Sequence, residues 1–231
     1  MADLSHFPIT QKWPAKDPSV IQLYSFPTPN GVKVSIALEE MGLAYEAHTV
    51  TLSDADVKSP EFLSLNPNNK IPAIVDPNGP EGPIGLFESG AILLYLAEKS
   101  GKFGGTTATE KAHITQWLMF QMGGLGPMFG QMGFFYKFAG AQIEDPRPRE
   151  RYRDEAKRLL TVLDKELAEK DWIAGGYSIA DMAIAPWLRA TDFYGTRDIL
   201  GWNNYKNVQA YLDRFLKRPA VQTGLVTPPR A

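Results

Sequence analysis

The apolar and polar positions of the first hundred residues follow two periodicities, one typical of strands and one typical of helices. The apolar run Val20–Tyr24 and the alternating, Thr- and Val-rich run Tyr45–Leu52 are typical of strands. Between them, Val32–Met41 carries apolar residues at helical spacing and ends at Gly42. This order predicts a β-α-β unit followed by a β-β-α unit. The second unit and its approach comprise a short helix around residues 60–63, a strand beginning at Pro72, a strand over Ile84–Phe87 and a helix over Ala91–Lys99.

The same pattern predicts two domains and an N-terminal arm. Residues 1–19 contain three prolines and no regular hydrophobic period, which predicts an extended arm on the surface or on a partner subunit. Residues 20–102 form the α/β domain, and the Gly- and Thr-rich stretch 101–109 is the linker. Residues 109–225 are helical in pattern and form an all-helical C-terminal domain. The expected fold class is therefore α/β plus all-α.

One stretch, Ala112–Tyr136, contains no Lys, Arg, Asp or Glu and is long enough to span a bilayer. Its glutamines, its glycines and Pro127 argue against a membrane helix. They predict a buried helix that ends in a flexible, Met-rich loop. The aromatic and methionine side chains between residues 117 and 136 form either core packing or the wall of a pocket for apolar substrates.

Composition and charge narrow the classes of function. The formal net charge of the 231 residues is -2 and no Lys/Arg run exceeds two residues, which argues against nucleic-acid binding. The three histidines lie far apart, so no metal site is expected. Cysteine is absent, which excludes disulfides, thiolate metal sites and a protein thiol nucleophile. Any thiol chemistry must therefore use a borrowed thiol. The N-terminal residues lack the pattern of a secretory signal, so the expected location is cytoplasmic.

Thr28 and Asn30 flank Pro29 in the loop after the first strand. In open α/β sheets, ligands bind at the carboxyl ends of the strands. Hydroxyl and amide groups at such a place can donate hydrogen bonds to an anion, and a thiolate held there would have a lowered pKa. Thr-Pro-Asn-Gly is also an ordinary turn sequence.

Glu88 and Ser89 open the predicted helix over Ala91–Lys99. Ser89 is placed to cap this helix, and the free N–H groups at a helix start attract a carboxylate. Glu88 beside it could pair with an ammonium group, so the two residues together would suit the α-amino-acid group of a ligand. The alternative is a capping serine next to a solvated glutamate.

Two features of the second domain complete the set of motifs. Ser178 and Asp181 have the spacing of a capping box, which is a folding signal. The stretch Arg147–Arg158 contains five arginines, partly alternating with acidic residues, and predicts a solvated helix face.

Together these motifs identify a resemblance to the glutathione transferases. The segments that carry it are Thr28–Gly31, Asn68–Ile74, Phe87–Leu93 and the Ser178–Asp181 box, and their order and spacing most resemble the Nu class and the related fungal nitrogen-regulator group. The resemblance covers residues from about 20 to 220. It implies a thioredoxin-like N-terminal domain, an all-helical C-terminal domain, a homodimer and a cis Ile71-Pro72 bond.

The resemblance also implies roles for individual residues. Thr28 and Asn30 are expected to be catalytic by holding the glutathione sulfur, and Pro72, Ser178 and Asp181 to be structural. Ser25 is a local competitor for the thiol but does not match the position of the catalytic residues of other classes. Val57 stands where some Nu members carry a polar residue that contacts glutathione. The glutathione-binding set that the resemblance implies is Asn30, Lys70, Ile71, Glu88, Ser89 and Arg151.

For activity, the Nu-class resemblance implies glutathione-dependent disulfide reduction, with two glutathione molecules or one glutathione disulfide per subunit and no metal. Without a protein thiol, one glutathione must attack the substrate disulfide and a second must resolve the product. Two alternatives remain: conjugation or peroxide reduction acting on small apolar electrophiles, and a glutathione-binding regulator without turnover. The expected partners are glutathione, a small disulfide or electrophile and a second subunit, with neither nucleic acid nor membrane.

Overall fold

The structure is a computed structural model that describes residues 4–230. The chain divides into two compact units, and each is considered by itself. Unit 1 runs to Lys102 and resumes at Pro219, and unit 2 comprises Phe103–Arg218. The last helix, placed by the sequence pattern in the range of the helical domain, therefore lies in unit 1.

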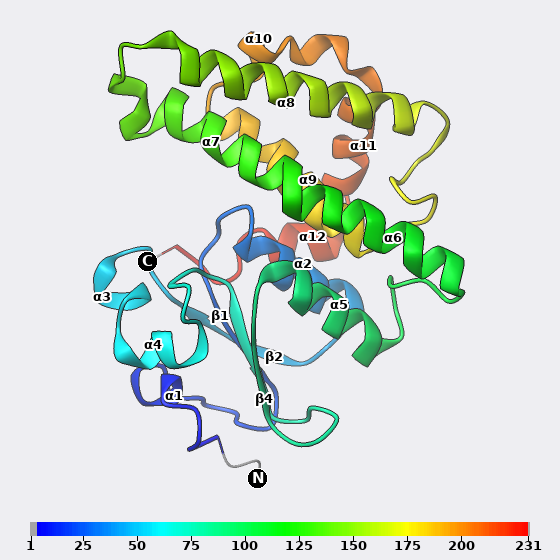
Figure 1. Ribbon diagram of the computed structural model, residues 1–231. Coiled ribbons are helices and arrows are strands. Elements are labelled where there is room, and N and C mark those ends of the chain that lie inside the picture. Colours follow the sequence, from blue (N-terminus) through cyan, green and yellow to red (C-terminus); the bar gives the residue numbers. More distant parts are fainter. Residues whose placement is uncertain (1–3, 231) are drawn as a thin grey trace. The chain divides into compact units, whose positions relative to one another are not determined.

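Unit 1 is an α/β unit built on one sheet (Figure 1). Its predicted strands and helices are found within a few residues of their expected bounds, and Gly42 ends the first long helix in the left-handed conformation, with φ 69°. The elements are α1 (Ile9–Lys12), β1 (Ile21–Ser25), α2 (Gly31–Met41), β2 (Tyr45–Thr49), α3 (Asp54–Val57), α4 (Pro60–Leu65), β3 (Ala73–Asp76), β4 (Ile84–Phe87), α5 (Ser89–Ser100) and α12 (Pro219–Gly224).

The sheet has the strand order β2-β1-β3-β4. β1 and β2 are parallel neighbours, and the crossover helix α2 connects them. β3 is antiparallel to both β1 and β4. Side chains of a strand alternate between the two faces. Tyr24 and Ala73 face a core shared with α4, so Leu23 and Ile74 face the other side, where α2 and α5 pack side by side (Figure 1). This arrangement is the thioredoxin-like topology that the resemblance implied.

The prediction of an extended arm was wrong for the described residues 4–19. The segment forms α1 and packs into unit 1 itself, with Ile9 fully buried. Trp13 meets the rings of Tyr24 and Phe62 edge-on, with ring centroids 6.3 Å apart in each case. A four-residue helix between prolines is too short to show a hydrophobic period, so the sequence pattern could not reveal it.

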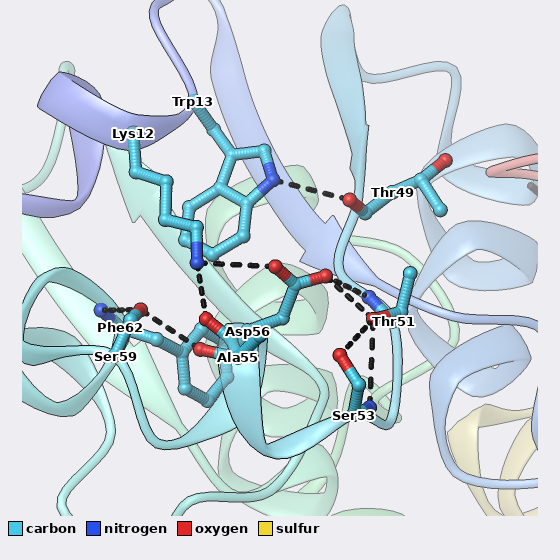
Figure 2. Close-up of polar contacts among 9 residues, drawn as sticks. All are labelled: Lys12, Trp13, Thr49, Thr51, Ser53, Ala55, Asp56, Ser59 and Phe62. Atoms are coloured by element: carbon cyan, nitrogen blue, oxygen red, sulfur yellow. Dashed lines mark hydrogen bonds and ion pairs between the residues drawn. The ribbon is translucent and has the colours of Figure 1, made fainter.

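Polar contacts fasten the arm to the segment after β2 (Figure 2). The Trp13 indole donates to the carbonyl oxygen of Thr49 at 3.1 Å, and the ammonium of Lys12 lies 3.1 Å from a carboxylate oxygen of Asp56. Asp56 in turn accepts from the backbone N–H of Thr51 at 2.9 Å. The arm thereby braces the connection between β2 and α3.

The C-terminal helix α12 packs against α2. The hydroxyl of Ser35 donates to the carbonyl oxygen of Gly224 at 2.6 Å, and a Cβ at Gly224 would lie 2.6 Å from the backbone of Ile36. The backbone of α12 therefore approaches α2 at a distance that only glycine allows. The first and the last described segments of the chain are thus both part of unit 1.

The regular elements named in unit 2 are helices, as predicted, and its 3₁₀ and π segments are short. The Ser178–Asp181 capping box is confirmed: the Ser178 hydroxyl accepts from a backbone N–H at the start of α9, and the Asp181 carboxylate accepts from the Ser178 N–H at 2.9 Å. The elements are α6 (Ala108–Phe120), the π segment η1 (Gln121–Leu125), α7 (Gly126–Lys137), η2 (Ala139–Gln142), α8 (Pro146–Glu166), η3 (Leu167–Glu169), α9 (Ile179–Phe193), α10 (Arg197–Leu200), η4 (Trp202–Asn204) and α11 (Lys206–Leu216).

The flexible, Met-rich loop expected within the Ala112–Tyr136 stretch was also a wrong prediction, because the chain stays helical from α6 through η1 into α7. The glycines of α7 serve close packing within unit 2. A Cβ at Gly130 would lie 3.3 Å from the Trp187 ring, and one at Gly133 would lie 2.7 Å from the Tyr194 ring. Glycine therefore allows the two aromatic rings to pack directly on the helix backbone.

Two further observations concern residues 4–230. In this part of the chain no helix is both long and apolar enough to cross a membrane. Nor does any group of three or more His, Asp or Glu side chains within it form a candidate metal site.

Candidate functional site

The first part of the candidate site is the turn between β1 and α2. The side-chain oxygen of Thr28 accepts a hydrogen bond from the N–H of Gly31 at 3.2 Å, and its carbonyl oxygen accepts from Val32 at 3.0 Å. Thr28 thereby caps α2, whereas the Asn30 side chain makes no capping hydrogen bond to the helix. Since a hydroxyl both accepts and donates, Thr28 keeps a proton to donate to an anion beside the helix N-terminus.

Ser25 is buried against this turn. Its side chain is fully buried, and its hydroxyl has no hydrogen-bond partner among the described residues. A Cβ at Gly31 would lie 2.6 Å from the Ser25 hydroxyl oxygen, so glycine is required directly above it. This burial makes Ser25 a packing residue and leaves Thr28 and Asn30 as the half-buried polar groups of the turn.

The second part is the approach to β3. The peptide bond between Ile71 and Pro72 is cis, as the resemblance implied. The amide group of the buried Asn66 donates to the carbonyl oxygen of Lys70, which shapes the loop before this bond, and the Lys70 side chain is exposed. Ile71 precedes β3, and none of the backbone hydrogen bonds that the described turns, loops and helix caps form involves it. Its backbone groups are therefore suited to pair with an extended ligand, as an added strand would.

The third part is the start of α5. Glu88 is exposed and has φ 70°, a left-handed conformation that is uncommon for a residue other than glycine. The expectation that Ser89 caps α5 was wrong. Glu88 occupies the cap position, and Ser89 is the first helical residue and only 4% exposed. The strained turn at Glu88 carries the chain directly from β4 into the helix, which draws Ser89 into the helix itself.

The strand register brings these three parts together. Ala73, the first residue of β3, lies opposite Tyr24 near the end of β1 and opposite Phe87 at the end of β4. The turn with Thr28, the cis bond at Ile71 and the start of α5 at Ser89 therefore leave the sheet at the same edge. Segments separated by sixty residues of sequence form one polar edge that carries two helix N-termini.

A residue that the sequence analysis missed lies beneath this edge. Lys33 of α2 is fully buried, and its ammonium donates to the Ser89 hydroxyl oxygen at 3.2 Å. Burial lowers the pKa of Lys33 to about 7, and the negative charge of Glu88 opposes this shift. One signal was available: Lys33 precedes the apolar Ile36 and Ala37 by three and four residues, which places it on their helix face.

Two further residues singled out from the sequence lie elsewhere. Val57 belongs to the core beside the arm and is only 8% exposed, so its side chain serves packing. Arg151 lies in unit 2, in the second turn of α8, and is exposed. The surrounding arginines and acids form the ion pairs of a solvated helix face, such as Arg158 with Glu155 at 2.7 Å.

Comparisons with known proteins agree with this architecture. The model of the glutathione S-transferase N-terminal domain matches residues 19–98, and that of the glutathione S-transferase C-terminal domain matches residues 146–214. Among curated proteins, the disulfide-bond oxidoreductase YfcG of Escherichia coli is 46% identical over 210 residues, which are 90% of this chain and 95% of that protein.

Solved structures extend the likeness to the whole chain. A glutathione transferase from Pseudomonas putida, with one glutathione disulfide bound per subunit, is 61% identical, has a TM-score of 0.96 and matches over 98% of this chain and 99% of its own. One from Burkholderia graminis, with two glutathione molecules bound per subunit, is 58% identical, has a TM-score of 0.98 and matches over 100% and 98%. With both domain models, the sheet topology and the helical second unit in agreement, the chain belongs to the glutathione S-transferase family.

Proposed function

We propose that this protein is a glutathione-dependent disulfide-bond reductase of the Nu class. The observation that carries the proposal is the polar sheet edge in a chain without cysteine, where Thr28, the cis bond at Ile71 and the start of α5 converge. Support comes from relatives named disulfide-bond oxidoreductases and from similar structures that hold one glutathione disulfide or two glutathione molecules per subunit.

Glutathione would bind along this edge by its three parts. The free N–H groups of the first turn of α5, together with the Ser89 hydroxyl, would take the α-carboxylate of the γ-glutamyl group, and Glu88 would pair with its ammonium group. The backbone of Ile71 would pair with the cysteinyl part, and Lys70 would add positive charge toward the carboxylates of glutathione. Arg151 belongs to the glutathione-binding set on the ground of the family resemblance. This binding places the sulfur at the turn with Thr28 and Asn30.

The reaction proceeds by two thiol–disulfide exchanges. Thr28 and Asn30 donate hydrogen bonds to the glutathione thiolate and, with the N-terminus of α2, lower its pKa. The thiolate attacks one sulfur of the substrate disulfide, forms a mixed disulfide and releases the other sulfur as a thiolate, which takes up a proton. A second glutathione thiolate attacks the glutathione sulfur of the mixed disulfide, which yields glutathione disulfide and the second substrate thiol.

The absence of cysteine requires that both thiols come from glutathione, which explains a site for two glutathione molecules. Such a reaction consumes reduced glutathione, so it fits the cytoplasm, where the glutathione pool is kept reduced. A homodimer is part of the proposal and is implied by the family resemblance. Light scattering during gel filtration tests it, with twice the mass of the chain as the expected result.

The test of the proposed function is steady-state reduction of a small disulfide by glutathione, coupled to glutathione reductase and run beside conjugation of an aromatic halide. The expected result is fast disulfide turnover that falls in Asn30→Ala and stays in Ser25→Ala, because the Ser25 hydroxyl is fully buried. Strong conjugation with negligible disulfide turnover would replace the proposal by a conjugating transferase. Glutathione binding with neither activity would indicate a regulator.

A further inference from the structure

Lys33 is a buried lysine whose chemistry the reaction above does not use. Its side chain is fully buried, and its ammonium donates a hydrogen bond to Ser89, the first residue of the helix whose N-terminus is proposed to bind the γ-glutamyl group. Burying an ammonium is costly, so a lysine in this place needs a compensating interaction with negative charge. The position of negative charge near the ammonium therefore indicates the role of Lys33.

The elements that pack around Lys33 supply little negative charge. α2 packs against β1, α5 and α12, and neither β1 nor α12 contains an Asp, Glu, Lys, Arg or His. On α5, the charged residues Glu98 and Lys99 lie in the last turn, far along the helix from Ser89. The tyrosines on these elements, Tyr24 and Tyr95, have raised pKa values because of burial and stay neutral at physiological pH. Glu88 is the carboxylate whose charge acts on Lys33.

The hydrogen bond to Ser89 has a direction that favours an anionic ligand. As an ammonium, Lys33 can only donate, so the Ser89 hydroxyl oxygen accepts and its proton serves a different acceptor. The first-turn N–H groups of α5 point the same way, out of the helix N-terminus. The buried charge, the serine proton and the helix end therefore all favour a carboxylate at one point.

We propose that Lys33 is a positioning residue for glutathione: it fixes the Ser89 hydroxyl and places a buried positive charge behind the N-terminus of α5, where the α-carboxylate of the γ-glutamyl group binds. This inference rests on the proposed function, because it assigns the carboxylate to glutathione. It adds a residue that touches no substrate atom and acts through Ser89 and through its charge.

This role of Lys33 predicts that ligand binding is linked to proton uptake. Burial brings the pKa of Lys33 to about 7, so the side chain is partly neutral in the unbound protein at pH 7.5. A carboxylate bound nearby favours the charged form, so the protein should take up part of a proton as the ligand binds. A role in packing alone would give no proton uptake linked to the α-carboxylate.

The experiment compares two ligands on three proteins by calorimetry. The ligands are S-methylglutathione, whose blocked thiol cannot ionise, and its analogue that lacks only the α-carboxylate. The proteins are the wild type, Lys33→Met and the control Lys99→Met. Lys99 lies at the far end of α5 from Ser89, and its ammonium pairs with Asp76 at 2.9 Å. Lys33→Met is expected to weaken S-methylglutathione at least tenfold and to change the affinity of the analogue less than twofold, while Lys99→Met changes neither ligand by more than twofold.

In turnover, Lys33→Met is expected to raise KM for glutathione at least tenfold with kcat within about threefold, since a positioning residue acts on binding. Equal weakening of both ligands, or no weakening of either, would overturn the inference. If Lys33→Met fails to fold, proton uptake by the wild type at pH 7.5 tests the inference, measured by calorimetry in two buffers of different ionisation enthalpy. Binding of S-methylglutathione should be accompanied by proton uptake, and binding of the analogue should not. Equal proton uptake with both ligands rejects the inference. A wild type that binds no S-methylglutathione would reject the proposed function as well, whereas normal disulfide turnover with an unchanged Lys33→Met rejects only the role of Lys33.

Discussion

The hydroxyl oxygen of Thr28 accepts a hydrogen bond from the backbone N–H of Gly31 at 3.2 Å, so one side chain both caps α2 and faces the proposed sulfur position. Thr28→Val keeps the side-chain shape and removes both interactions. We expect a loss of about 1 kcal/mol in the free energy of unfolding from the missing cap. The pKa of the bound glutathione thiol should rise by about one unit, which lowers kcat/KM for disulfide reduction roughly tenfold at pH 7.

Thr28→Ser is the matched control because it retains the hydroxyl. Its activity and stability should stay close to those of the wild type, measured by the coupled assay and by urea unfolding. If Thr28→Val kept full activity, the sulfur would not depend on this hydroxyl.

Stability should depend on pH through Lys33. Its folded pKa of about 7 is lower than its usual 10.5, so between these values the unfolded chain binds more protons than the folded one. The free energy of unfolding of the ligand-free protein should therefore rise with pH from about 7.5 to 9.5, by up to about 1 kcal/mol per pH unit. Well below pH 7 both states hold the proton, and this contribution to the slope ends.

Other perturbed groups titrate outside that window. Burial lowers the pKa of His48 from 6.5, so its effect lies at lower pH, and the raised pKa values of Tyr24, Tyr45 and Tyr95 act only above pH 10. Urea unfolding of the wild type and of Lys33→Met across the window provides the check. The same slope in both proteins would show that Lys33 is not the titrating group.

The arm should contribute to stability and not to chemistry. Trp13→Phe removes the hydrogen bond to the Thr49 carbonyl oxygen and should cost about 1 kcal/mol. Trp13→Ala also empties part of the core beside Tyr24 and Phe62 and should cost about 3 kcal/mol or more. Urea midpoints measure both, and the coupled assay below the unfolding transition should give unchanged kcat.

Lys12→Met is the comparison for the arm. The Lys12 side chain is 30% exposed in its ion pair with Asp56, so the loss should be only about 0.5 kcal/mol. A cost for Trp13→Ala no larger than that of Lys12→Met would contradict the buried position of the indole.

Two glycines of the segment once expected to be a loop should respond in opposite ways. A Cβ at Gly133 would lie 2.7 Å from the Tyr194 ring, so Gly133→Ala should destabilise unit 2 by about 1–3 kcal/mol. At Gly123 nothing lies within 4 Å of a Cβ, so Gly123→Ala should be neutral or add up to about 1 kcal/mol from helix propensity. Thermal unfolding followed by circular dichroism measures both. Equal tolerance of the two substitutions would mean that the segment is not packed as a helix.

The sequence by itself determined the local elements and the family. Helical spacing from Val32 to Met41, alternation in the strands and the Ser178–Asp181 box are local signals, and the helix, the strands and the box lie where they were expected. The cis bond at Ile71 followed from the family resemblance. The chemistry of a borrowed thiol was expected because cysteine is absent.

The tertiary structure decided what depends on contacts between distant segments. The register of Ala73 between Tyr24 and Phe87 gathers the polar edge, and the strained turn at Glu88 makes Ser89 the first residue of α5 in place of its cap. Glycines that suggested a loop allow aromatic rings to pack on α7. Burial of Lys33 and of the arm depends on which segments pack over them. Local periodicity shows which face of a helix is apolar, but it does not show which partner covers that face.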